Sequence, residues 1–150
     1  MKQLRRPYPI STTSIGLIAL CVLLPRVAVA DDTSSPCAAL KHIVAAAPDG
    51  FAGLSPDDGK AVAQTYGDDA QCTASAGSYR CLWTQRKDAA SSADVLQTVA
   101  ADVASCLPDA THDQNSPSSQ HFYLGARGSR TTITATTAGG NRLQLTVSGK

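Results

Sequence analysis

The chain has 150 residues, and its thirteen lysines and arginines nearly balance twelve acidic residues, all of which are aspartate. This length suits a single domain beside a targeting segment. The net charge is +1 and becomes slightly negative without the first thirty residues, which argues against nucleic-acid binding, because phosphate recognition needs clustered cations. The aspartates all precede residue 114 and the remaining segment is basic, and we expect these charges to neutralise each other in the folded domain.

Residues 1–30 have the three parts of a signal peptide. Basic side chains within residues 2–6 are followed by an apolar run at residues 15–24 and by the small residues Ala28-Val29-Ala30. The apolar run is shorter than the roughly twenty residues that span a membrane. We therefore expect residues 1–30 to be removed, leaving residues 31–150 as a single periplasmic or secreted domain with no stable membrane span.

Four cysteines remain after this cleavage: Cys37, Cys72, Cys81 and Cys106. An even number of cysteines in an exported domain predicts two disulfide bonds. A zinc site would need close pairs such as C-x-x-C, which the chain lacks. Three pairings are open from the count alone.

Two helices are predicted near the start of the mature chain. Ser35-Pro36 combines an N-cap with a proline at the first helical position, and Pro48-Asp49-Gly50 ends that helix. Cys37 lies on its apolar face. Ser55-Pro56 begins a second, short helix that reaches Tyr66 and is closed by Gly67. We interpret its Asp-Asp pair as helix capping rather than as a calcium loop, which would alternate its ligands and end in glutamate.

A hairpin and a long helix follow. Strands at residues 71–75 and 78–85 flank Ala76-Gly77, and a turn there places Cys72 opposite Cys81, where a cross-strand disulfide fits. Asp88 is expected to cap a helix through Leu107 whose apolar stripe includes Cys106. Two core-facing helical cysteines favour the pairing of Cys37 with Cys106, and the alternative joins Cys81 to Cys106.

The last part of the chain is predicted to be a polar, mobile loop at residues 109–119 followed by strands at 121–124, 131–137 and 142–148. The final loop decides the register of the last two strands. A three-residue loop on Gly139-Gly140-Asn141 pairs Ala135 with Leu145 and keeps both on one apolar face, whereas a two-residue turn would not.

These elements predict an α+β fold. We expect an antiparallel sheet of about five strands, covered on one face by two to three helices and stapled by disulfides. The other face would carry alternate polar residues of the last strands, namely Arg130, Thr132, Thr134, Thr136, Arg142 and Gln144. A threonine ladder of this kind usually indicates a solvated strand.

No catalytic, metal-binding or cofactor-binding residue is predicted. His42, His112 and His121 lie at no metal-ligand spacing and are interpreted as surface residues. No serine stands in a nucleophile elbow, and the cysteines are expected to be oxidised. Adjacent aspartates are better explained as caps than as acid and base partners.

A few features resemble small periplasmic proteins of Gram-negative bacteria that inhibit or neutralise secreted enzymes and toxins. They are the signal peptide, the four-cysteine mature chain, the C-x-W sequence that ends at Trp83 and the Cys106-Leu107-Pro108 helix end. The resemblance implies binding to another protein and transfers no functional residue.

The predicted function is therefore that of a binding module, an inhibitor or immunity protein, and not an enzyme. Its partner would be another protein of the envelope or periplasm. The predicted contact residues are Arg127, Arg130, Arg142 and His112. The alternatives are an enzyme or small-anion-binding protein whose site combines scattered residues, such as these arginines with Tyr123, and a structural protein of the envelope.

Overall fold

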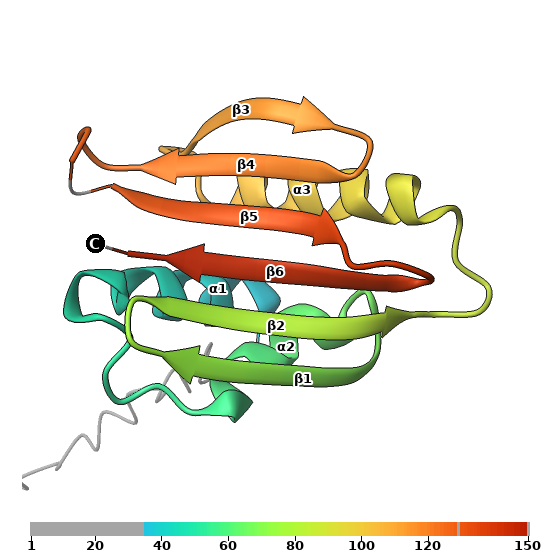
Figure 1. Cartoon of the computed structure of the whole chain (residues 1–150), viewed down its shortest axis with the longest axis horizontal. Coiled ribbons are helices and arrows are strands. Elements are labelled where there is room, and N and C mark those ends of the chain that lie inside the picture. The colour runs from blue at the N-terminus through green and yellow to red at the C-terminus, as the bar shows by residue number, and fades with distance from the viewer. Residues whose placement is uncertain (1–34, 129, 150) are drawn as a thin grey trace, which may run out of the picture.

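The computed structural model describes residues 35–128 and 130–149, which form an antiparallel six-stranded sheet with helices on one face (Figure 1). The strand order is β1-β2-β6-β5-β4-β3. The predicted α+β class is confirmed, with one strand more than expected. The predicted signal peptide lies outside the described residues. The helices and strands are α1 Pro36–Ala45, η2 Ala47–Asp49, η3 Pro56–Gly59, α2 Lys60–Gln64, β1 Gly67–Ser75, β2 Ser78–Gln85, α3 Ser92–Cys106, β3 Thr111–Ser116, β4 Ser119–Leu124, β5 Thr131–Thr137 and β6 Arg142–Ser148.

Helix α1 begins as its sequence predicts. The Ser35 hydroxyl oxygen accepts a hydrogen bond from the backbone N–H of Ala38 at 3.1 Å, and Pro36 occupies the first helical position. The helix ends before Pro48, and Gly50 closes the next turn at a φ of 65°, where an L side chain is strained.

Helix α3 is shorter than predicted. It starts at Ser92 rather than after Asp88, because Ser91 and Asp94 form a capping box. The Asp94 N–H donates a hydrogen bond to the Ser91 hydroxyl oxygen at 3.3 Å, and the Ser91 N–H donates one to Asp94 Oδ2 at 3.2 Å. This reciprocal arrangement satisfies more of the free N–H groups of the first turn than a lone aspartate would.

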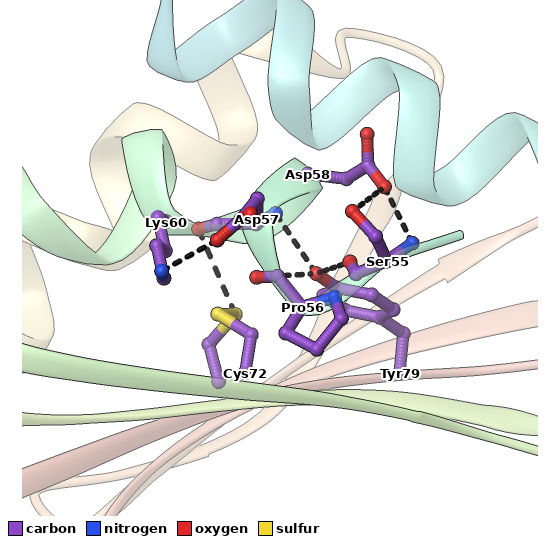
Figure 2. A network of polar contacts seen from close by, with 9 residues as sticks. Ser55, Pro56, Asp57, Asp58, Lys60, Cys72 and Tyr79 are labelled. Atoms are coloured by element: carbon purple, nitrogen blue, oxygen red, sulfur yellow. Dashed lines mark hydrogen bonds and ion pairs between the residues drawn. A yellow bond between two sulfur atoms is a disulfide. The ribbon is translucent and has the colours of Figure 1, made fainter.

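The segment before β1 is held to the sheet by Tyr79, a buried residue of β2 (Figure 2). The Tyr79 hydroxyl accepts a hydrogen bond from the Gly59 N–H at 2.8 Å and donates one to the Ser55 carbonyl at 2.8 Å. A Cβ atom at Gly59 would lie 2.6 Å from both the Tyr79 ring and Cys81 Sγ. Only glycine therefore allows this approach. The short helix predicted from Ser55-Pro56 to Tyr66 is present as η3 followed directly by α2, which ends at Gln64.

Both predicted disulfides are present in the described residues. Cys37–Cys106 joins α1 to α3 with a Cα–Cα distance of 5.4 Å, and Cys72–Cys81 joins β1 to β2 with a distance of 4.0 Å. Cys72 and Cys81 are register partners across the Ala76-Gly77 turn, as predicted. The predicted pairing of Ala135 with Leu145 across β5 and β6 is also confirmed.

The predicted mobile loop at residues 109–119 is wrong. Residues 111–116 form β3, an edge strand antiparallel to β4, and β4 begins at Ser119 rather than at His121. The segment reads as a loop because it contains no aliphatic residue that alternates with polar ones. The side chain of β3 that contacts the helix side of the sheet is His112, which stacks on Phe122.

The core lies between the sheet and the helices. Alternate residues of the strands face it, and they meet the apolar stripes of α1 and α3. Its largest fully buried side chains include Trp83, Tyr79, Phe122, Ile43, Leu96, Ile133 and Leu143. The helices lie on this side, and none of the described residues 35–128 and 130–149 forms an element that covers the opposite side of the sheet (Figure 1).

Candidate binding surface

The uncovered side of the sheet, here called the open face, faces the viewer in Figure 1. Cross-strand register aligns its side chains in rows. The middle row runs through Thr73, Arg80, Thr146, Thr134, His121 and Asp113. One flanking row runs through Gln71, Leu82, Gln144, Thr136, Ser119 and Ser116. The other runs through Ser75, Ser78, Ser148, Thr132, Tyr123 and Thr111. The open face is thus almost entirely polar.

Arginines line two hollows near the β1 edge of the open face. Arg80, with Thr73, Ser75 and Ser78, lines one of about 170 Å³. Arg142 lines a second of about 310 Å³, where it lies near Asp69, Gln71 and Thr84. The β1 register shifts between Asp68 and Gln71, and Asp69 has a φ of 53°. This bulge re-aims the strand and forms one wall of the hollow. Both arginines are exposed and can donate paired hydrogen bonds to a partner's carboxylate.

Arg130 occupies another corner of the open face. Its guanidinium carbon lies 4.2 Å from the centroid of the Tyr123 ring, which is a cation–π geometry. Stacking fixes the plane of the guanidinium group, and Arg130 is exposed. Its predicted role as a partner-binding residue stays a prediction.

His121 forms a hydroxyl-rich cluster at the centre of β4. Its Nε2 lies 2.8 Å from the Ser119 hydroxyl and its Nδ1 3.3 Å from the Thr134 hydroxyl. Asp113 is its register partner on β3. His121 was expected to be an ordinary surface histidine. Ser119 lies two residues away on the same strand, whereas Thr134 and Asp113 come close to His121 only through strand pairing.

His112 does not lie on the open face. Its ring stacks on buried Phe122 with centroids 4.1 Å apart and planes 3° apart, on the helix side of the sheet. Its Nε2 is 2.9 Å from the side-chain oxygen of Gln120, and the Gln120 amide donates to the Ser116 carbonyl at 2.8 Å. Because an amide oxygen only accepts, His112 Nε2 carries the proton. His112 thus covers the buried ring of Phe122 while staying exposed itself, as expected of a surface histidine, but it lies on the side of the sheet opposite to the open-face arginines.

The predicted arginines do not form one cluster. Arg130 precedes β5, whereas Arg142 begins β6 beside Thr84, at the other end of the hairpin. Strand geometry separates these ends by about 20 Å. Arg127 is exposed in the loop between β4 and β5, near the Arg130 end. A single anion site made from Arg127, Arg130, Arg142 and Tyr123 is therefore excluded by the topology.

Arg80 is the open-face residue that the predicted site omitted. The alternation in β2, with Tyr79, Cys81 and Trp83 buried, already places Arg80 on the opposite face. What the sequence did not reveal is its position in the middle row, which depends on β2 pairing with β6, a strand more than sixty residues away. Long-range pairing of this kind leaves no local signal.

The described residues contain no group of three or more histidine, cysteine or acidic side chains placed to hold a metal ion. No helix in the described ranges is long and apolar enough to cross a membrane. No family model, curated protein or solved structure matches the chain.

Proposed function

We propose that this chain is an exported binding module that recognises another protein of the envelope or periplasm through the open face. In this proposal, inhibition or neutralisation of the partner results from contact and not from catalysis. The supporting observation is that no helix or strand of the described part of the chain covers this sheet face, which carries exposed arginines at separate positions among short polar side chains.

The distribution of these arginines suits a broad surface rather than a small ligand. Arg80 lies midway along the strands but near the β1 edge of the face, and Arg130 and Arg142 lie towards opposite ends of the strands. Arginine is enriched at protein interfaces, where its planar group pairs with carboxylates and stacks on aromatic rings. The serines and threonines between them have little side-chain entropy to lose when a partner covers them.

Charge reversal tests the proposed surface. Arg80→Glu and the double variant Arg130→Glu with Arg142→Glu should each weaken capture of a periplasmic partner by about tenfold or more, because they place like charges in the interface. Lys41→Glu is the matched control, since Lys41 is exposed on α1, on the helix side. Affinity capture followed by mass spectrometry identifies the partner, and titration then measures the affinity of each variant.

Two outcomes would contradict the proposal. Equal partner affinity in the native and charge-reversed proteins would exclude the open face. A larger loss in Lys41→Glu would place the contact on the helix side. Circular dichroism of each variant confirms that the fold is retained.

Export is the other part of the proposal. The disulfides fit an oxidising compartment, and the apolar run with Ala28-Val29-Ala30 fits cleavage before Asp31. The intact mass of the protein recovered from the envelope fraction should equal that of a chain that begins at Asp31. Recovery of the full chain with reduced cysteines from the cytoplasm would contradict export.

A hydrolytic enzyme is the second candidate, and the His121 cluster favours it. With Nε2 unprotonated, His121 can accept the Ser119 proton while Nδ1–H donates to the Thr134 hydroxyl. An enzyme of this kind would lose ester hydrolysis in both Ser119→Ala and His121→Gln. The binding proposal instead expects no turnover by the native protein with simple ester substrates.

A further inference from the structure

A cavity of about 260 Å³ lies on the helix side of the sheet, between α1, α2 and α3. Its walls are the side chains of Pro36, Leu40, Val62, Tyr66, Val99 and Val103, together with the Cys37–Cys106 disulfide. The aliphatic side chains of Leu40, Val62, Val99 and Val103 are buried and belong to the core. The interior is thus apolar and is built on elements that the disulfide holds together.

The rim of this cavity carries a carboxylate. Asp102 Oδ2 accepts a hydrogen bond from the Tyr66 hydroxyl at 2.7 Å, and Asp102 is exposed. The Tyr66 hydroxyl is the donor in this contact, and burial, with Asp102 beside it, raises the pKa of Tyr66 well above its ordinary value. This hydrogen bond fixes the carboxylate at the cavity mouth.

Asp102 has no cationic partner in the part of the chain that the structure describes. The ion pairs among those residues are His42 with Asp58 and Lys60 with Asp57. A carboxylate held at the mouth of an apolar cavity, without a cation of its own, is complementary to a positively charged group. An anionic ligand would be repelled at the same place.

We propose that this cavity binds a small cationic amphiphile. Its apolar body lies between the helices and its protonated amine contacts Asp102. A cavity of 150 Å³ accommodates benzene, so 260 Å³ accommodates roughly an aromatic ring with a short side chain. The site is independent of the open face, and a ligand here could bind while the open face is occupied.

Three probes of matched size and different charge test the proposal: 2-phenylethylamine, 2-phenylethanol and 3-phenylpropionate. In heteronuclear NMR titrations of the mature protein, the amine should shift the amide signals of Val99, Val103 and Tyr66. It should bind about tenfold more tightly than the alcohol, and the carboxylate should bind weakest.

Asp102→Asn separates the charge from the cavity. Because Asp102 is exposed, this variant should fold normally. It should bind the amine about tenfold more weakly and the alcohol within about twofold of the native affinity. Asp88→Asn, an exposed aspartate in the loop before α3, is the matched control and should bind all probes like the native protein.

Several results would overturn the proposal. They are an absence of shifts with every probe, shifts confined to other residues, equal affinity for the amine and the carboxylate, or an unchanged preference for the amine in Asp102→Asn. Concentration-dependent self-association without probe binding would assign the cavity to a contact with a second copy. None of these outcomes bears on the open face, so they leave the proposed function separately testable.

Discussion

The outer strand pairs, β1–β2 and β3–β4, end the same sheet but are fastened by different chemistry. Cys72–Cys81 crosses the first pair covalently. The second pair is held beneath β3 by His112 stacked on Phe122 and by the buried side chain of Gln120. The Cys72–Cys81 disulfide can be inferred from cysteine spacing. The contact of His112 with Gln120 depends on the pairing of β3 with β4, which no local sequence pattern predicts. The more easily predicted edge is therefore the covalent one.

The largest expected effect comes from the bond that joins the helix layer. Replacing both partners, Cys37→Ala with Cys106→Ala, releases a sequence separation of 69 residues. The chain-entropy model gives a loss of about 4 kcal/mol in the free energy of unfolding. Cys72→Ala with Cys81→Ala releases a separation of 9 residues and should cost about 2.5 kcal/mol by the same model.

Thermal unfolding of the two double variants measures this order. The difference should appear as a lower transition temperature for the variant without Cys37 and Cys106. The opposite order would show that packing around buried Cys72 and Cys81 outweighs loop closure. Reactive thiols in the native protein would show that the cysteines are not paired and would contradict the claim that a disulfide holds the β1–β2 edge.

The polar contacts that hold β3 to β4 can be removed by a substitution that keeps the side-chain volume nearly unchanged. Gln120→Met removes the hydrogen bonds to His112 and to the Ser116 carbonyl, and Gln120 is 1% exposed. Loss of a buried polar partner costs about 1–3 kcal/mol. Amide exchange in β3 should accelerate, while exchange across Cys72–Cys81 stays unchanged.

Gln144→Met is the matched control for this change. Gln144 lies on the open face and bonds only to the neighbouring Thr146 hydroxyl among the interactions of the described residues. Its replacement should change stability by less than about 0.5 kcal/mol. If Gln144→Met destabilises as much as Gln120→Met, the network beneath β3 is not what holds that edge.

The contrast between these edges explains what the sequence could predict. Turn residues fix register over short distances, so the Ala76-Gly77 and Gly139-Gly140-Asn141 turns predicted both hairpins correctly. Segment 109–119 was mispredicted because β3 has polar residues on both faces, and its inward contact is His112. The start of α3 was misplaced because Asp88 and Ser91 are both acceptable caps, and only the Asp94 contact selects Ser91.

The candidate site also divides into features that a local pattern predicts and features that depend on how the strands pair. The side of β5 and β6 that carries Arg130 and Arg142 follows from alternation along one strand, and it was predicted. The distance between these arginines follows from the register of the β5–β6 hairpin, although they were selected together as one site. The position of Arg80 beside β6 follows from strand order across the sheet. The stacking of His112 on Phe122 and the contact of His121 with Thr134 also depend on strand pairing. For this reason His112 was selected as a surface contact and His121 was not.

The smallest expected effect concerns the segment that Tyr79 holds against the β1–β2 edge. The Asp58 carboxylate accepts hydrogen bonds from the Ser55 N–H at 2.6 Å and the Ser55 hydroxyl at 2.8 Å (Figure 2). The Ser55 backbone hydrogen bond, followed by that of its side chain, lowers the pKa of Asp58 below its ordinary value of 3.8, and His42 contributes in the same direction. A carboxylate whose pKa is lower in the folded state stabilises the fold above its unfolded pKa. That stability is lost as the pH falls through the folded pKa.

Between neutral pH and pH 4, native protein should therefore be more stable than Asp58→Asn, and the two should converge as the pH falls further. The difference should be small, because solvent screens a partly exposed carboxylate. Asp57→Asn is the control, since Asp57 is exposed and contacts Lys60 at 2.5 Å without capping the turn. Urea unfolding at a series of pH values measures the free energy of unfolding of all three proteins.

A constant difference between native protein and Asp58→Asn down to the lowest pH would show that the Asp58 contribution does not depend on its charge. The turn would then be held by Tyr79 and Gly59 alone, with hydrogen bonds that do not titrate in this range.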